Sequence, residues 1–280
     1  MTILDLPNEL LLLVAVDLSI KELYRFLSTC RRLSSLLTPH FHQLSLQDVG
    51  PLTALNWAAR YGHASLAEIV LSKGAGGVGD GKRQRPGPTP LRLAIEYNHP
   101  DVIRVLAKHG QQVAGAELHM AASQRSAQAI RVLLELGADM AFKGIEGDTP
   151  AHISARRGDV DSMKAFIDAG LDFHLQNRLG WTVLHEAAFS GHKAMMGFLL
   201  GHGGKKVIDV QDPRGKTPLH WALIKPPSEG IIQLLCDHGA NTDLADYEGQ
   251  TPLSLALGCG RSTTRVRPSL IATGVRRWRR

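Results

Sequence analysis

The stretch GKTPLHWALI, residues 215–224, carries the strongest structural signal in the chain. Thr217 followed by Pro218 is typical of a helix start, because a threonine side chain can bond an unpaired N–H of the first turn and proline has no N–H to leave unpaired there. Gly215, two residues before the threonine, suits a tight turn. The residues that follow, with the small Ala222 among them, predict a short helix that packs closely against a neighbour.

The same pattern recurs along most of the chain. The aligned fragments are LTALNWAARYGH, PTPLRLAIEYNH, AELHMAASQRSA, DTPAHISARRGD, WTVLHEAAFSGH, KTPLHWALIKPP and QTPLSLALGCG. Their first residues in register, here called anchors, are Thr53, Thr89, Ala116, Thr149, Thr182, Thr217 and Thr251. Successive anchors lie 36, 27, 33, 33, 35 and 34 residues apart. A period of this length indicates a repeat architecture, in which neighbouring units stack to bury a continuous core.

A second helix is expected in each unit. Apolar residues at helical spacing, such as Val160, Met163 and Phe166, follow the first helix and its turn. Glycine can adopt the left-handed backbone that ends a helix, and one lies 21 residues beyond each of five anchors, at Gly74, Gly110, Gly137, Gly170 and Gly203. Other glycines lie two residues before an anchor, at Gly87, Gly147, Gly180, Gly215 and Gly249.

This pattern resembles the ankyrin repeat, whose hallmark TPLH stands unaltered at residues 217–220. The resemblance implies an all-α solenoid over residues 50–258, with six near-complete units and a partial seventh. Antiparallel helix pairs would stack side by side, and β-turn fingers would project from them to form a concave surface for partner proteins.

Several units depart from the pattern. The insert Gly74–Pro88 lengthens the first finger, and the 27-residue spacing before Ala116 shortens the second. Lys225-Pro226-Pro227 interrupts the turn between the helices of the sixth unit. The seventh unit stops at Gly258-Cys259-Gly260, before a convincing second helix, and the composition then changes as an altered reading frame or splice choice would change it.

The N-terminal segment, residues 1–45, carries its own helical signals. Three short amphipathic helices are expected here, the second opened by a capping box at Ser19–Glu22. So few residues cannot bury much apolar surface alone, so the segment either caps the first repeat or docks on a partner. The segment resembles an F-box through Leu6, Pro7, Leu10, Val14, Leu18, Leu23, Leu27 and Cys30. It departs from that motif at Leu33, where tryptophan is frequent. The resemblance implies that the first seven of these residues bind the Skp subunit of a cullin–RING ligase.

Charge argues against a nucleic-acid partner. The formal net charge is +6, but residues 261–280 contain seven arginines and no acidic residue, so residues 1–260 are close to neutral. That basic tail is expected to be disordered. The apolar run Leu10–Val16 is too short for a membrane span, and three scattered cysteines fit a reduced, cytoplasmic or nuclear protein.

No catalytic, cofactor or metal site is evident, so the protein is not expected to be an enzyme. Gly76, Gly81 and Lys82 imitate a phosphate-binding loop but lack the Ser or Thr after the lysine. The chain holds thirteen histidines, and four of them occupy the fourth position of the repeated tetrapeptide; these four are His119, His152, His185 and His220. The resemblance to the ankyrin repeat implies that these rings bond neighbouring loop groups, so a structural role is expected in place of metal ligation.

The remaining candidate for function is a surface. Positions seven and eight residues after each anchor would face the concave side if the ankyrin resemblance holds. The arginines and aromatic residues there are candidate target-binding residues, because such side chains favour interfaces; they are Arg60, Tyr61, Tyr97, Arg156, Arg157 and Phe189.

The sequence thus predicts a substrate adaptor of a Skp–cullin–F-box ubiquitin ligase, whose repeats hold an unidentified target. The alternative is a non-ligase scaffold or inhibitor whose N-terminal helices cap the array. A third hypothesis makes the arginine-rich tail a nuclear-import or RNA-binding segment.

Overall fold

The computed structural model describes residues 51–72, 89–224 and 228–256, which form two compact units divided between Val113 and Ala114. The regular elements of the described residues are all helical. None of these helices is both long and apolar enough to cross a membrane. The F-box-like segment and the basic tail lie outside the described residues.

The first unit, here called unit 1, contains two helix pairs. They are α4 (Pro51–Tyr61) with α5 (Ala64–Ser72), and α6 (Pro90–Glu96) with α7 (Pro100–Lys108). Helix α4 packs against α6, and α5 packs against α7, so the pairs lie side by side. Helix α4 begins at Pro51, ahead of the predicted start at Thr53.

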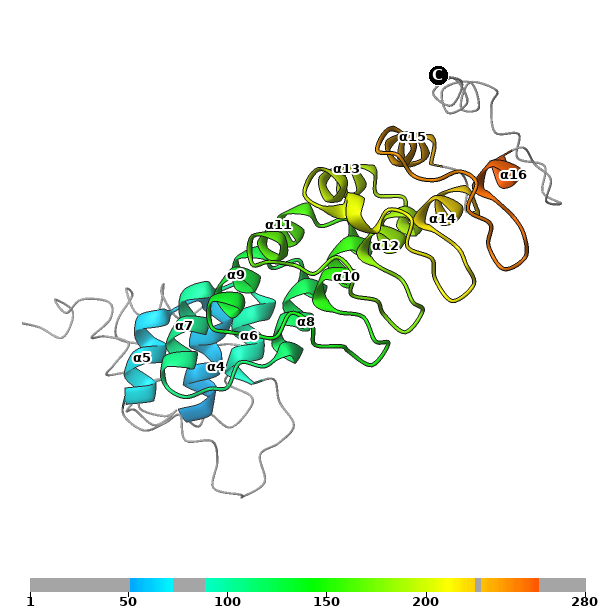
Figure 1. The fold of residues 1–280 in the computed structure, drawn as a ribbon. Coiled ribbons are helices and arrows are strands. Elements are labelled where there is room, and N and C mark those ends of the chain that lie inside the picture. Colours follow the sequence, from blue (N-terminus) through cyan, green and yellow to red (C-terminus); the bar gives the residue numbers. More distant parts are fainter. Residues whose placement is uncertain (1–50, 73–88, 225–227, 257–280) are drawn as a thin grey trace, which may run out of the picture. The chain divides into compact units, whose positions relative to one another are not determined.

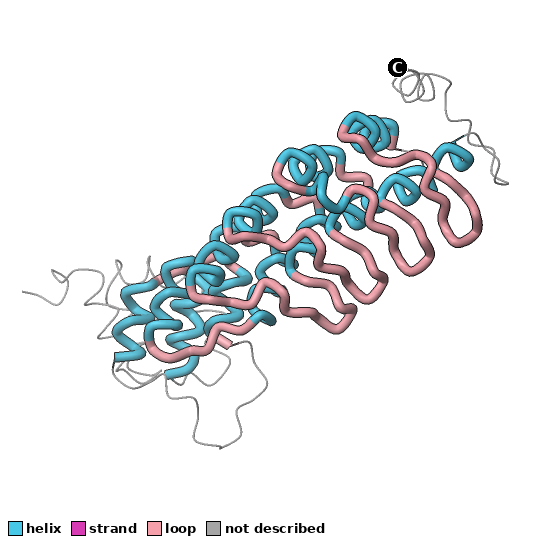
Figure 2. Tube along the Cα trace, in the orientation of Figure 1, coloured by secondary structure: helices cyan, strands magenta, loops and turns pink. Residues whose placement is uncertain are grey.

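The second unit, here called unit 2, is likewise built of helix pairs (Figure 1). Its first helices are α8 (Gly115–Gln124), α10 (Pro150–Arg157), α12 (Val183–Ser190), α14 (Pro218–Ile224) and α16 (Pro252–Ala256). Its second helices are α9 (Ala127–Glu135), α11 (Val160–Asp168), α13 (Lys193–Gly201) and α15 (Glu229–Asp237), with the short 3-10 helix η2 (Gly204–Val207) after α13. Each set packs along its own row. The loops between pairs project on one side as fingers (Figure 2).

Small and large side chains divide the core between the two rows. Alanines such as Ala121, Ala155 and Ala187 are fully buried in the first helices, which lets neighbouring first helices approach closely. The second helices contribute larger side chains, including the fully buried Met163 and Phe166. The helical periodicity predicted from the sequence for these helices is therefore confirmed.

The repeated histidines join each repeat to the next. His152 Nε2 lies 2.8 Å from the carbonyl oxygen of Trp181, and His185 Nε2 lies 3.2 Å from that of Lys216. His119 and His220 reach the carbonyls of Asp148 and Gln250 in the same way, at 3.1 Å.

The other ring nitrogen of the buried histidines faces the anchor threonine. Nδ1 of His185 lies 2.9 Å from the Thr182 hydroxyl and 3.1 Å from its backbone nitrogen. Because Nε2 faces a carbonyl, it carries the proton, and Nδ1 accepts from the threonine. Burial lowers the pKa of His185 to about 4, which keeps the ring neutral at physiological pH. The predicted structural role of these histidines is confirmed.

The finger glycines have the backbone that the sequence predicted. Gly147, Gly180, Gly215 and Gly249 all have positive φ, between 70° and 78°. A Cβ at Gly180 would also lie 2.3 Å from Pro213 Cδ of the next finger, so the close approach of fingers adds a second reason for glycine.

The third repeat differs from its prediction. Helix α8 begins at Gly115, with Ala114 as its N-cap, so the helix starts ahead of the anchor Ala116. Ala114 has no side-chain acceptor to cap the helix, and the Glu117 carboxylate instead accepts the Ala114 N–H at 3.0 Å. A Cβ at Gly115 would lie 2.1 Å from Phe142 Cβ, which explains the glycine at the first helical position.

The His185→Ala variant tests the inter-repeat bonds. It leaves the Lys216 carbonyl and the Thr182 hydroxyl without their buried partner, so we expect a loss of about 2–4 kcal/mol in the free energy of unfolding. Urea denaturation measures this loss. The control is His174→Ala at an exposed finger position, for which a change within about 0.5 kcal/mol is expected. Equal effects of the two variants would contradict the structural role.

Candidate protein-binding face

Three fingers of unit 2 share a polar turn residue five positions before the anchor, whereas the finger before α10 has Gly144 there. Asn177, Asp212 and Asp246 each accept two backbone N–H groups on one side-chain oxygen. For Asn177, the donors are Leu179 N at 2.9 Å and Trp181 N at 3.0 Å. This bonding closes the finger tip and leaves the second polar atom of each side chain available for the preceding repeat.

Asn177 uses its second atom to join two buried carboxylates. Its Nδ2 donates to Asp148 Oδ1 at 2.7 Å and to Glu186 Oε1 at 3.1 Å. An aspartate at this position would add a third acceptor where two already converge. The amide therefore explains why this finger has asparagine while the following two have aspartate.

Arg156 completes this polar group. Its Nη2 donates to Asp148 Oδ2 at 2.5 Å, and Nη1 lies 3.9 Å from Glu186 Oε1 and 4.0 Å from Glu146 Oε2. Burial raises the pKa of Glu186 to about 7, assisted by the charges of Asp148 and Glu146 and opposed by Arg156. Three carboxyl groups thus surround one guanidinium.

Three aromatic rings pack together beside this group. The ring centroids of Trp181 and Trp221 are 4.8 Å apart, and Phe189 lies 4.9 Å from Trp181 and 5.6 Å from Trp221. Trp181 is buried, whereas Phe189 and Trp221 are partly exposed. Asp212 Oδ2 accepts both indole N–H groups, at 3.2 Å from Trp181 and 3.0 Å from Trp221.

In the following finger, Asp246 uses its second oxygen for a different partner. Its Oδ2 accepts from the ammonium group of Lys216. Burial opposes ionisation of the aspartate, but Lys216 and the backbone N–H groups of Gln250 and Glu248 outweigh it and lower the pKa. The Asp246–Lys216 pair is buried, so it joins the last two fingers and contributes little to the exposed surface.

Glu186 and Phe189 share a face of α12, because positions three or four apart share a helix face, and the finger residues Asn177 and Trp181 contact that face. Trp221 occupies on α14 the position that Glu186 occupies on α12. The name "binding face" is used for Asp148, Arg156, Asn177, Trp181, Glu186, Phe189, Asp212 and Trp221.

The six predicted target-binding residues lie partly in unit 1 and partly in unit 2. Arg156 and Phe189 belong to the binding face of unit 2. In unit 1, the guanidinium carbon of Arg60 lies 5.1 Å from the Tyr97 ring centroid and 5.8 Å from that of Tyr61. Arg157 is exposed, and its carbonyl accepts from the Arg125 side chain.

Sequence reasoning missed most of the binding face. Trp181 precedes an anchor, Trp221 and Glu186 lie four residues after one, and Asp212 lies five before one. A signal was present in the spacing Asn/Asp-x-x-Gly-x-Thr, which recurs at residues 177–182, 212–217 and 246–251. The predicted Skp-binding residues, from Leu6 to Leu27, lie outside the described residues.

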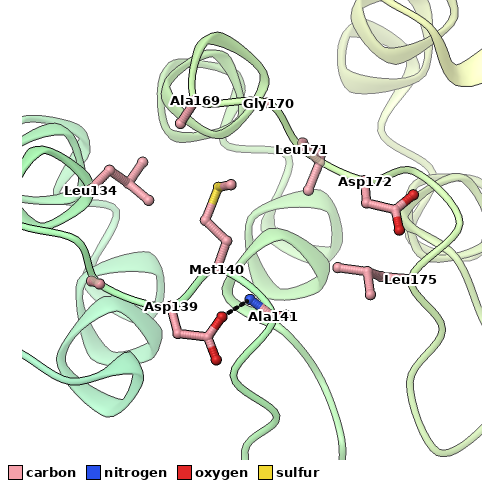
Figure 3. Close-up of a pocket in the computed structure, with 10 residues that line it drawn as sticks. Leu134, Asp139, Met140, Ala141, Ala169, Gly170, Leu171, Asp172 and Leu175 are labelled. Atoms are coloured by element: carbon pink, nitrogen blue, oxygen red, sulfur yellow. Dashed lines mark hydrogen bonds between the residues drawn. The ribbon is translucent and has the colours of Figure 1, made fainter.

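A separate pocket of about 320 Å³ lies between the loops that follow α9 and α11. Figure 3 shows the Met140 side chain between Leu134 and Leu171, with Leu175 on the far side. The carboxylate of Asp139 accepts its own loop's Ala141 N–H at 2.8 Å. The lining is thus mainly apolar and offers no set of convergent catalytic groups.

Metal binding finds no support in the part of the chain that the structure describes. No group of three or more His, Cys, Asp or Glu side chains is placed there to hold an ion. The binding face instead consists of ring surface, one guanidinium and carboxyl groups, which suits contact with another macromolecule.

The raised pKa of Glu186 predicts a pH-dependent stability difference. The carboxyl ionises near 4.5 in the unfolded chain and near 7 in the folded chain, so its ionisation destabilises the fold as pH rises between these values. The Glu186→Gln variant lacks this titration. We expect its free energy of unfolding, relative to that of the natural chain, to rise by up to about 3 kcal/mol between pH 4.5 and 7. Urea denaturation at both pH values measures this rise, and a pH-independent difference would contradict the assignment.

Comparison with known proteins agrees with this geometry. A family model described as ankyrin repeats (3 copies) matches residues 23–115, 118–209 and 205–265. SH3 and multiple ankyrin repeat domains protein 2 of Homo sapiens is 29% identical over 182 residues, which are 62% of this chain and 10% of that protein. The B-cell lymphoma 3 protein homolog of Mus musculus is 27% identical over 239 residues, 80% of this chain and 50% of the relative. This chain therefore spans half or less of the length of these relatives.

A solved structure supports the fold independently. The crystal structure of the ankyrin repeat domain of Bcl-3 superimposes with a TM-score of 0.66 at 22% identity, covering 78% of this chain and 97% of that one. With the family model matching most of its length, the chain belongs to the ankyrin repeat family.

Proposed function

We propose that the chain is a protein-binding adaptor that holds a segment of a target protein on the binding face of unit 2. The observation that carries this proposal is the aromatic cluster. Phe189 and Trp221 keep partly exposed ring surface, while Asp212 satisfies the indole N–H groups inside the protein. Partly exposed rings of this kind are typical anchors of protein interfaces.

Arg156 adds a second anchor type at the margin of the cluster. It is 40% exposed although Asp148 holds one edge of its guanidinium. A side chain fixed in this way loses little conformational entropy when a partner binds. Rigid rings and a fixed guanidinium together favour recognition by a face that is already formed.

The finer proposal concerns the N-terminal segment. We propose that Leu6, Pro7, Leu10, Val14, Leu18, Leu23 and Leu27 bind the Skp subunit, which makes the chain a substrate adaptor of a Skp–cullin–F-box ligase. The support is the F-box-like order of these residues. The adaptor would raise the local concentration of target lysines near the ligase.

A different observation favours the alternative, a scaffold or inhibitor without a ligase role. The first match to the ankyrin family begins at residue 23, inside the F-box-like segment. Part of this segment would then belong to the repeat array and cap it.

The Phe189→Ala variant tests target binding. A target is first identified by affinity purification with mass spectrometry, and its affinity for the purified full chain is then measured by calorimetry. We expect the substitution to weaken binding at least tenfold, because it removes a central ring of the face. The matched control is Phe198→Ala on α13, where the ring contacts His202 instead, and it should keep the natural affinity. Equal effects would contradict the assignment of the face.

Co-purification with the Skp subunit tests the ligase adaptor. The Leu6→Ala/Pro7→Ala double variant should lose Skp at least tenfold, whereas Phe189→Ala should retain it. If the double variant retains Skp, or if the natural chain never binds it, the scaffold alternative stands.

A further inference from the structure

Asp212 is a buried carboxyl group, and each of its two oxygens accepts hydrogen bonds. Oδ1 accepts Arg214 N at 2.8 Å and Lys216 N at 2.9 Å, and Oδ2 accepts the indole N–H groups of Trp181 and Trp221. Four donors directed at one carboxyl group are the arrangement of its ionised form. Only 4% of the residue is exposed.

This carboxylate has no positive partner among the described residues. The neighbouring Asp148 has Arg156, and Asp246 has Lys216, but no lysine or arginine in the described ranges forms an ion pair with Asp212. Its charge is balanced by N–H dipoles alone. The low dielectric of the interior lets such a charge act on nearby surface over several ångströms.

The surface nearest to this charge is aromatic. Both indole rings donate to the carboxylate, and Phe189 packs edge-on against Trp221, at an angle of 85° between ring planes. Aromatic rings attract cations to their faces, and a negative charge bonded to the indole N–H strengthens that attraction. The indole N–H groups are already used, so a partner meets ring surface without free donors.

The adjacent polar group has the same sign. Glu146, Asp148 and Glu186 surround a single guanidinium, that of Arg156. The raised pKa of Glu186, about 7, leaves this carboxyl only partly ionised at neutral pH, but Glu146 and Asp148 still outnumber the one guanidinium. Together with Asp212, this group disfavours an acidic partner segment and favours a basic one.

We propose that the Phe189–Trp221 surface receives a lysine or arginine side chain from the target segment. This inference rests on the proposed function, because it names the chemistry that the binding face selects. The partner is a protein segment in which a basic residue stands among apolar ones, the apolar residues contacting the exposed Ile224 at the end of α14.

The chain itself supplies a conservative variant for the test. Asn177 occupies in its own finger the position that Asp212 occupies in the next, and its oxygen closes the turn as the aspartate oxygen does. Asp212→Asn is therefore compatible with the finger backbone; it removes the charge beneath the rings and also replaces the acceptor of both indole N–H groups by an amide NH2, so the citrulline peptide is the test of charge alone. Asp246→Asn makes the same chemical change at the same position of the following finger, where the aspartate pairs with Lys216.

The experiment is a titration of the full chain with acetyl-Leu-Arg-Leu-Arg-Leu-amide, followed by the ¹⁵N resonances of the indole Nε1 atoms. The chain has four tryptophans, Trp57, Trp181, Trp221 and Trp278, and single Trp→Phe variants assign their four indole resonances. We expect the arginine peptide to shift the Trp181 and Trp221 resonances saturably. The same peptide with citrulline in place of arginine, which keeps the shape without the charge, should bind at least fivefold more weakly.

The variants separate the charge from the fold. Asp212→Asn should weaken binding of the arginine peptide at least fivefold, and Asp246→Asn should change it less than twofold; the dispersion of the amide spectrum checks that both fold. If Asp212→Asn unfolds, Trp221→Leu takes its place, with the same fivefold loss expected. Equal binding of the two peptides, absence of any shift, or natural affinity in the folded Asp212→Asn variant overturns the inference. If these results occur while Phe189→Ala still releases the target, target binding stands and only its basic chemistry is wrong.

Discussion

The structure of unit 2 depends on the hydrogen bond from a buried imidazole of one repeat to a backbone carbonyl of the next. No single helix pair can bury its apolar faces alone, so stability comes from the interfaces between pairs. His152 and His185 fix those interfaces, because each ring bonds its own anchor threonine on one side and the following finger on the other. A ring held at both nitrogens sets the distance and the register between repeats.

The contacts of the finger turns depend on the finger positions that these hydrogen bonds fix. Since each finger is held against its predecessor, a turn residue can close its own finger with one atom and reach the preceding repeat with the other. Asn177 reaches two carboxylates, Asp212 reaches two indoles and Asp246 reaches an ammonium group. The chemistry of the binding face thus arises from variation at one repeated position on an otherwise constant frame.

Within the described residues, departures from the repeat pattern have small structural consequences. Helix α8 starts at Gly115, and the Glu117 side chain caps it in place of the missing threonine. Helix α15 forms over Glu229–Asp237 although Pro226 and Pro227 shortly precede it in the sequence. Local irregularity is tolerated because the packing between rows, more than helix propensity, stabilises each short helix.

The sequence alone determined the repeat, its helix pairs and the finger glycines, because these follow from periodicity and from local backbone rules. The resemblance to the ankyrin repeat implied the role of the repeated histidines. It also identified Arg156 and Phe189 as surface candidates by their position in the repeat. Only the tertiary structure brought Trp181, Phe189 and Trp221 together over Asp212, and joined Asp148 to Glu186 through Asn177. The hydrogen bonds from Asn177 to Asp148 and from Trp181 to Asp212 join residues 29 and 31 positions apart in the chain, and therefore depend on how the repeats stack.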